Sequence, residues 1–251
     1  MYPELRGRVA VVTGAAGGLG RVTAQRLASL GVHVACADID EEAVSDTADM
    51  VRSSGARSLA SRVDITSTEE VNRWRDEVHA ELGPPSLILN VAGSLDRRMM
   101  DQLDQAGFMR SVEINAGGTY LVTRTFAPDA VAHGAGRVVN VASIAGFIGY
   151  PYPGYAASKA AVLNLTRTLV LDFWGTGVTV NAVCPGAMDT PMIKREAVPL
   201  MNAKTPIGRV ATADDVAGVI EFLCSAAAAC VNGTSVVVDG GATAVFRYFE
   251  T

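Results

Sequence analysis

The chain has 251 residues, of which 49% are hydrophobic and 19% charged, and its formal net charge at pH 7 is -5. This composition excludes a disordered chain, and the negative charge argues against a nucleic-acid partner, because a phosphate backbone requires a basic surface. The four cysteines form no CxxC pair and no cluster with histidine, so we expect no metal site and reduced thiols like those of cytosolic proteins.

From its start onward, the chain predicts strands that alternate with helices. Residues 1–8 are polar and unlike a signal peptide, and no later apolar run is long and unbroken enough to span a membrane, so we expect a cytoplasmic protein. Short apolar runs rich in β-branched residues predict parallel strands that are covered on both faces. The seven runs are 8–13, 32–37, 58–63, 86–90, 137–142, 178–183 and 235–238.

Helical patterns fill the gaps between these runs. Residues 41–53 begin with acidic residues and precede Gly55, which suits a C-terminal cap. Ser67 and Glu70 have the spacing of a capping box ahead of the next helical pattern, and residues 155–173 repeat small and aliphatic side chains at helical spacing. We predict one domain, residues 1–251, with an α/β fold: a Rossmann-type, doubly wound, seven-stranded parallel sheet with helices on both faces.

A glycine-rich turn follows the first predicted strand and precedes a helical pattern. Glycine lets such a turn tighten and lets the backbone approach a pyrophosphate at the helix N-terminus. An ordinary strand-to-helix turn is the alternative, but a second strand that ends in an acid follows here, as in nucleotide-binding folds. We therefore expect Gly14, Gly18, Leu19 and Gly20 to contact a dinucleotide.

The acid is Asp38, eighteen positions after Gly20. A carboxylate at this point can accept hydrogen bonds from the adenine ribose hydroxyls and repels a 2′-phosphate. No arginine lies within the turn or directly after Asp38, and we expect Arg21 to point to solvent, so the sequence predicts NAD as the cofactor. Asp38 could instead cap the following helix, a role that Asp40 could also fill.

Tyr155 and Lys159 are four residues apart, and therefore lie one turn apart on the same face of a predicted helix. The ordinary tyrosine pKa of about 10 makes a poor base at neutral pH, and a nearby cation lowers that pKa. We expect Lys159 to lower the pKa of Tyr155, so that the phenol exchanges a proton with an alcohol or a ketone. A solvated pair without function is the alternative, because this spacing is common on helices.

These motifs together resemble the short-chain dehydrogenase/reductase family, in its single-domain branch of roughly this length. The resemblance extends from about Gly7 to Gly241, and the family usually has asparagine where this chain has Val91. The matching residues, which occur in the family's order and at its spacing, are Thr13, Gly14, Gly18, Gly20, Asp64, Asn90, Ala92, Gly93, Asn115, Ser143, Tyr155, Lys159, Pro185 and Gly186.

The resemblance implies a catalytic set of four residues. Tyr155 would be the general acid/base, and Lys159 would lower its pKa and bind the nicotinamide ribose. Ser143 would hydrogen-bond the substrate oxygen, and Asn115, within a helix expected at 109–126, would hold a water that relays protons to the lysine. A simple turn serine and a mid-helix asparagine satisfied by backbone are the alternatives.

The resemblance also implies a cofactor cleft for NAD. Asp64 would contact the adenine, Asn90 and the backbone after it would line the cleft, and Thr190 would contact the nicotinamide amide. The expected cofactor-binding residues are Gly14, Gly18, Leu19, Gly20, Asp38, Ile39, Asp64, Ile65, Asn90, Ala92, Gly93, Tyr155, Lys159, Pro185, Gly186, Met188 and Thr190.

By the same analogy, residues 94–100, 144–153 and 187–206 line a substrate cleft. Their apolar side chains favour a small-molecule secondary alcohol or ketone on an apolar framework, although many of these side chains could simply pack. Arg97, Arg98, Lys194 and Arg195 could meet an acidic group, although a solvated loop is favoured. The family's helical contact surfaces imply a homotetramer, and we expect the aromatic tail at 246–249 to pack on a neighbouring subunit.

Three functions remain in competition at this point. An NAD-dependent oxidoreductase acting on an alcohol or a ketone is favoured. An NADP-dependent reductase of the 3-oxoacyl type is disfavoured by Asp38. A non-catalytic nucleotide-binding regulator is disfavoured because the set of Asn115, Ser143, Tyr155 and Lys159 is intact.

Overall fold

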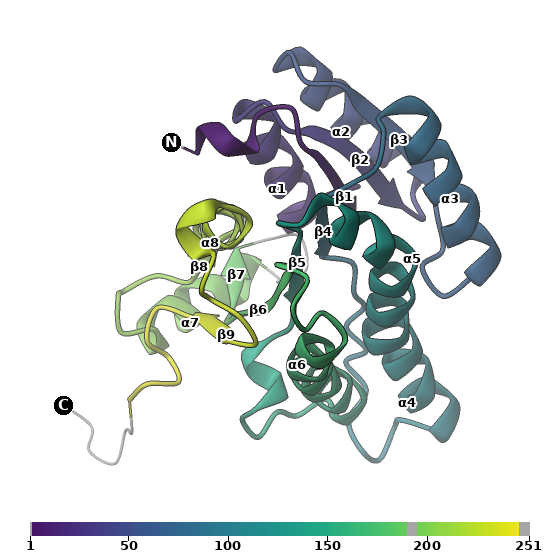
Figure 1. Ribbon diagram of the computed structural model, residues 1–251. Coiled ribbons are helices and arrows are strands. Elements are labelled where there is room, and N and C mark those ends of the chain that lie inside the picture. The colour runs from purple at the N-terminus through teal and green to yellow at the C-terminus, as the bar shows by residue number, and fades with distance from the viewer. Residues whose placement is uncertain (1, 190–194, 246–251) are drawn as a thin grey trace.

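The computed structural model describes residues 2–189 and 195–245, so Thr190 and the tail at 246–249 lie outside the described residues. Seven strands form one parallel sheet in the order β3-β2-β1-β4-β5-β6-β9 (Figure 1). The predicted fold class is confirmed, and each predicted strand overlaps an observed one. The strands are β1 Val9–Thr13, β2 His33–Asp38, β3 Ser58–Arg62, β4 Leu87–Asn90, β5 Arg137–Val141, β6 Thr179–Pro185 and β9 Ser235–Val238, and a separate pair joins β7 Met188–Asp189 to β8 Ala211–Thr212.

Helices cover both faces of the sheet, which explains why the strands are apolar at almost every position (Figure 1). Val12 points to the side packed by α1, α2 and α8, whereas Val11 points to the side packed by α3, α5 and α6. On the side packed by α3, α5 and α6, the rings of Trp74 and Phe126 meet edge to face with their centroids 5.1 Å apart. The helices are α1 Gly18–Ser29, α2 Glu41–Ser53, α3 Thr68–Glu81, α4 Gln105–Val112, α5 Gly118–His133, α6 Pro153–Asp172, α7 Val198–Lys204 and α8 Ala213–Cys224.

Two predicted local features differ from the structure. Ser67 caps α3 by accepting the backbone N–H of Glu70 at 3.2 Å, but the carboxylate of Glu70 accepts the N–H of Asp64 at 2.9 Å, so the reciprocal half of the capping box is missing. The helix predicted at 109–126 is wrong in its boundaries, because a π-helical segment, Glu113–Gly117, separates α4 from α5. Gly55 follows the C-cap of α2 with a φ of +85°, as a terminating glycine should.

Strand order reverses between β1 and β4, since β2 and β3 extend to one side and β5, β6 and β9 to the other. The carboxyl ends of parallel strands open a crevice at such a reversal, and ligands bind there in folds of this class. β1, β4 and β5 end at this edge, directly before the glycine turn, the Gly93 loop and Ser143. Within the described ranges no helix is long and apolar enough to cross a membrane.

Candidate active site

The glycine turn between β1 and α1 is closely packed against the end of β4. Gly14 has a φ of +70°, and a Cβ at this position would lie 2.8 Å from the backbone N and Cα of Ala92. A Cβ on Gly20 would overlap the carbonyl of Gly14. The hydroxyl of Thr13 accepts the N–H groups of Val91 and Ala92, both at 3.1 Å, and so joins the ends of the two strands. The turn therefore has a shape that only glycine permits at these two positions.

Asp38 lies at the end of β2 with its carboxylate directed at this turn. Its Oδ2 accepts the N–H of Ala16 at 3.0 Å, and its Oδ1 accepts the N–H of Asp40 at 3.2 Å. The cap of α2 is Asp40, whose Oδ1 accepts the N–H of Ala43 at 3.1 Å. The alternative that Asp38 caps the helix is therefore excluded. Ile39, next to it, is 67% exposed at the rim.

Arg21 does not point to solvent, so that prediction is wrong. Its Nε donates to the hydroxyl of Thr47 at 2.9 Å, and its Nη2 donates to the carbonyls of Ala43 and Ala16. Thr47, which is fully buried, donates in turn to the carbonyl of Ala15 at 2.7 Å. Because α1 packs against α2, the guanidinium meets backbone carbonyls before it reaches water. Arg21 and Thr47 thus tie the glycine turn to α2, a role that no local pattern in the sequence indicates.

Tyr155 and Lys159 lie on one face of α6, with the Lys159 ammonium 5.8 Å from the centroid of the Tyr155 ring. Lys159 is 4% exposed and donates to the carbonyl of Val141 at 2.8 Å, and burial lowers its pKa to about 8. Burial also raises the pKa of Tyr155, while a hydrogen bond with Ser143 lowers it. The expected net lowering of the Tyr155 pKa is not found, because desolvation of the phenol outweighs the effect of Ser143.

Asn115 lies in the middle of the π-helical segment and is fully buried. Its Oδ1 accepts the N–H of Ser94 at 2.8 Å, and its Nδ2 donates to the carbonyl of Ser94 at 3.0 Å and to the hydroxyl of Ser158 at 2.8 Å. A Cβ on Gly93 would lie 2.9 Å from this Oδ1 and 3.2 Å from the Lys159 Nζ. The loop after β4, the π segment and α6 therefore meet at one point. π segments are rare and are often found at functional sites.

Asn90, which the sequence analysis expects to line the cleft together with the backbone after it, ends β4 with its side-chain amide in the core. Its Nδ2 donates to the hydroxyl of Thr123 and to the Oδ1 of Asn140, both at 2.8 Å. Asn140 donates in turn to the hydroxyl of Thr166 at 3.0 Å, and all four residues are buried. This chain joins β4, β5, α5 and α6 beneath the site. The amide N–H groups of Asn90 are thus directed into the core, and sequence reasoning missed the other three residues.

The remaining expected cofactor residues lie around the same edge. Asp64 accepts the N–H and the hydroxyl of Thr66 at 2.9 and 2.7 Å, and these bonds lower its pKa. Ile65 packs against Gly118 in the first turn of α5. After β6, Gly186 approaches Asp239 so closely that a Cβ would lie 2.7 Å from the aspartate Cβ. Pro185 ends β6 and Met188 begins β7, whereas Thr190 lies outside the described residues.

An aromatic group stands beside Tyr155 on the outer side of the site. The ring of Tyr150 is 6.0 Å from that of Tyr155 and 5.6 Å from that of Tyr152, centroid to centroid. Phe147 and Ile148 nearby in sequence are 48% and 39% exposed. In the part of the chain that is described, no group of three or more histidine, cysteine, aspartate or glutamate side chains could hold a metal ion.

Comparison with known proteins connects this geometry to a family. A family profile described as enoyl-(acyl carrier protein) reductase matches residues 14–243. Cis-4-hydroxycyclohexanecarboxylate dehydrogenase from Sinomonas cyclohexanicum is 40% identical over 95% of this chain and 97% of that protein. Cyclohexanol dehydrogenase from Acinetobacter sp. strain SE19 is 33% identical over 97% of this chain and 98% of that protein.

Solved structures agree with these matches. A short-chain type dehydrogenase/reductase from Mycobacterium marinum superposes with a TM-score of 0.91 at 30% identity, covering 96% of this chain and 97% of that chain. The matches span nearly the whole chain, including the glycine turn, the π segment and α6. The chain belongs to the short-chain dehydrogenase/reductase family of nicotinamide-dependent oxidoreductases.

Proposed function

We propose that the protein is an NAD(H)-dependent oxidoreductase that interconverts a secondary alcohol and a ketone on a largely apolar substrate, with Tyr155 as general acid/base. The observation that carries this proposal is the meeting of Tyr155, Ser143 and Lys159 at the strand ends where the glycine turn lies. The substrates named for the two relatives, a hydroxycyclohexanecarboxylate and cyclohexanol, support a secondary alcohol on a ring.

The residues present fit a nicotinamide dinucleotide. Gly14 and Gly20 form a cradle that a Cβ would fill, and backbone N–H groups at a helix N-terminus suit a pyrophosphate. Asp38, directed at this turn, favours NAD because its carboxylate would repel a 2′-phosphate. When bound, the dinucleotide accepts a hydride from the alcohol or donates one to the ketone. Asp64, Ile65 and the backbone of Ala92 and Gly93 would hold its other parts.

Proton transfer is the task of this chain's own side chains. In alcohol oxidation the Tyr155 oxygen takes the hydroxyl proton as the hydride leaves, and in ketone reduction it returns that proton. Ser143, whose hydroxyl lowers the pKa of Tyr155, would hold the substrate oxygen. The Lys159 ammonium would contact the nicotinamide ribose, and its charge would oppose, without cancelling, the effect of burial on the Tyr155 pKa. Asn115, anchored by Ser94 and Ser158, would position the water that connects this lysine to solvent.

Exposed apolar residues on α5 and α6 support an oligomer, for which we propose a homotetramer. Leu171 is 67% exposed, and Tyr120 is 46% exposed. A groove of about 480 Å³ lies between the two helices, lined in part by Tyr120, Leu169 and Phe173. Light scattering would detect the assembly, and monodisperse monomers would contradict it. The cytoplasmic location and the single domain stay predictions of the sequence.

The test of the function is Tyr155→Phe. We expect kcat for cyclohexanol oxidation to fall by roughly 100- to 10,000-fold, the contribution of a positioned general acid/base. NADH binding, followed by nicotinamide fluorescence, should stay within about twofold of wild type, since the ring is retained. A variant that turns over normally would show that another group exchanges the proton. Tighter binding of NADPH than NADH would contradict the role of Asp38 and favour a reductase of the 3-oxoacyl type.

A further inference from the structure

The loop between β4 and α4, residues 91–104, contacts catalytic elements at both of its ends. Near its start, Ser94 is held by the side chain of Asn115, and Gly93 lies against Asn115 and Lys159. Near its other end, Leu103 packs against Gly154, the residue before Tyr155: a Cβ on Gly154 would lie 3.3 Å from the Leu103 Cδ2. The conformation of this loop therefore determines what stands beside the catalytic helix.

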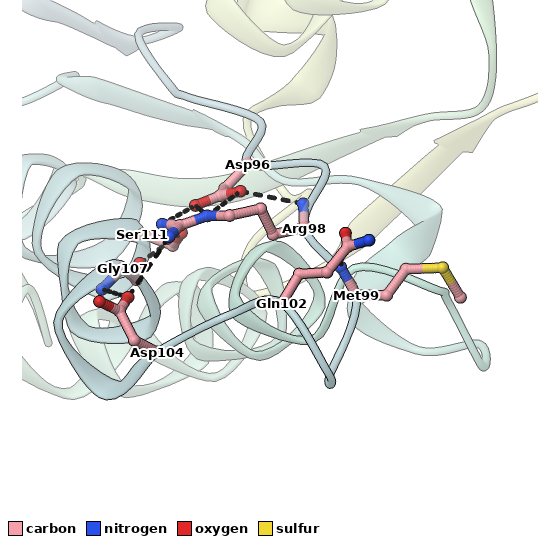
Figure 2. A network of polar contacts seen from close by, with 7 residues as sticks. All are labelled: Asp96, Arg98, Met99, Gln102, Asp104, Gly107 and Ser111. Carbon is pink, nitrogen blue, oxygen red and sulfur yellow. Dashed lines mark hydrogen bonds and ion pairs between the residues drawn. The ribbon is translucent and has the colours of Figure 1, made fainter.

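Arg98 fixes the middle of the loop through two carboxylates (Figure 2). Its Nε and Nη2 donate to Asp96 at 3.1 and 2.7 Å, and its backbone N–H donates to the same carboxylate at 3.0 Å. Its Nη1 reaches the Oδ1 of Asp104 at 3.4 Å. Asp104 is also the N-cap of α4, since it accepts the N–H of Gly107 at 2.9 Å. The loop is thus tied both to itself and to the start of the helix that follows.

Gly107 makes room for this arrangement. A Cβ at Gly107 would overlap the Nη2 of Arg98 and lie 2.9 Å from its Cζ, so the guanidinium lies directly on the first turn of α4. Glycine within a helix is otherwise unfavourable. The close approach of Arg98 gives a physical reason for glycine at this position.

An exposed ion pair alone would not justify attention to Arg98, because such pairs contribute little to stability. This one differs in geometry. Asp96 accepts hydrogen bonds from three N–H groups of a single residue, and the second carboxylate belongs to a helix cap. The contacts therefore define one loop shape rather than a loose attraction. The two carboxylates also neutralise the guanidinium, which argues against Arg98 as the residue that binds an acidic group of the substrate.

We propose that Arg98 is a positioning residue: with Asp96, Asp104 and Gly107 it holds residues 94–104 as a preformed wall of the substrate site next to Tyr155. The inference rests on the proposed alcohol–ketone activity and adds the contacts that fix the substrate side of the active site. A preformed wall raises the efficiency of the reaction because the loop needs no ordering when the substrate binds.

The test combines two single variants and their double variant. We expect Arg98→Met to lower kcat/KM for cyclohexanol roughly tenfold, mainly through KM, while the Kd of NADH stays within about twofold. Gly107→Ala should give a similar loss by displacing the guanidinium. Adding Gly107→Ala to Arg98→Met should cause no further loss, since the obstructed group is then absent. Arg98→Lys, which cannot make the bidentate contact, should not restore wild-type KM. Arg75→Met, which removes an exposed ion pair with Asp76 on α3, is the matched control.

A readout independent of turnover separates this inference from the function on which it rests. Amides of residues 94–104 should exchange hydrogen faster in Arg98→Met than in wild type, measured with no substrate present. Unchanged exchange would overturn the inference, as would kcat/KM within twofold of wild type. Fully additive losses in the double variant would also overturn it. If the amides exchange faster in Arg98→Met but the wild-type protein oxidises no alcohol, the proposed function is contradicted and the role of Arg98 in fixing the loop is supported.

Discussion

The two sides of the site are built by different means. On the nucleotide side, the glycine turn packs backbone against backbone, and the buried Thr47 holds it from below. On the substrate side, the loop at 91–104 is fixed by exposed charged side chains, and Met99 and Met100 are 50% and 86% exposed. At Gly14 and Gly20 the nucleotide side leaves no space for a methyl group, whereas the middle of the loop on the substrate side presents side chains to solvent.

This difference indicates which side tolerates change. A backbone cradle serves any dinucleotide of one shape, and a side chain added at Gly14 or Gly20 collides with main-chain atoms that cannot move aside. A wall made of side chains can be altered one residue at a time without disturbing the sheet beneath it. We therefore expect substitutions at Gly14 and Gly20 to weaken cofactor binding, and those on the substrate side to change substrate preference.

In the comparison of the two sides, the largest effect should come from Gly14→Ala, which tests the backbone cradle. The alanine would have to adopt the left-handed φ of +70° that Gly14 has, and its Cβ would lie 2.8 Å from the backbone of Ala92. Strain of this kind costs ~1–3 kcal/mol, and overpacking costs a further ~1–3 kcal/mol. We expect the urea midpoint to fall and NADH binding, followed by fluorescence, to weaken at least about tenfold.

Gly17→Ala is the matched control in the same turn. Gly17 has an extended φ of -170°, and no neighbouring atom lies within 4 Å of a Cβ built there. Its free energy of unfolding should stay within ~0.5 kcal/mol of wild type. If Gly14→Ala changed the free energy of unfolding and the NADH affinity as little as Gly17→Ala, the turn would be more adaptable than its packing indicates. The contrast between the two sides would then disappear.

Lys159 stands where the two sides meet, and its burial predicts a pH effect. The pKa is about 8 in the native protein and about 10.4 in an unfolded chain, so between these values the unfolded chain holds a proton that the native site releases. Wild-type stability should therefore rise with pH across this window relative to Lys159→Met, by on the order of 2–3 kcal/mol between pH 7 and 10.

Urea unfolding of both proteins at each pH measures this difference. Burial raises the thiol pKa of Cys36 and Cys184 to about 11 and of Cys224 to about 12, which lowers native stability as the pH rises above 9. Those thiols are present in both proteins, so their contribution largely cancels. A difference that does not change with pH would mean that the ammonium is better solvated than its 4% exposure indicates.

Features that depend on local patterns could be predicted from the sequence. Apolar runs define strands because both faces of the sheet are covered, and the glycine turn, Asp38 and the Tyr155–Lys159 spacing are properties of short segments. Gly14 and Gly20 are constrained by close backbone approach, which glycine spacing already indicates. These features share one property, since each leaves its signature in the residue types of a short segment even where its contacts are distant in sequence.

Features that depend on partners distant in sequence could not be predicted. Arg21 binds α2 instead of solvent because of how two helices pack, and Asn90 turns inward because Asn140 lies beside it on β5. The π segment at Asn115 has no residue signature. The pKa of Tyr155 rises because burial, which a four-residue spacing does not reveal, outweighs the contact with Ser143.

The smallest effect concerns Tyr150 and tests the substrate side. The centroid of its ring is 6.0 Å from that of the Tyr155 ring at an interplanar angle of 47°, so it forms an aromatic surface next to the Tyr155 ring. An aromatic contact contributes ~0.5–1.5 kcal/mol. The ratio of kcat/KM for cyclohexanol to kcat/KM for 2-propanol should therefore fall by roughly two- to tenfold in Tyr150→Leu. Tyr150→Phe should keep the wild-type ratio, because it retains the ring. Equal losses of kcat/KM for the cyclic and the linear alcohol would mean that Tyr150 supports Tyr155 rather than contacting the substrate. Tyr150 would then belong to the invariant part of the site, like the glycine turn, and not to the part that determines substrate preference.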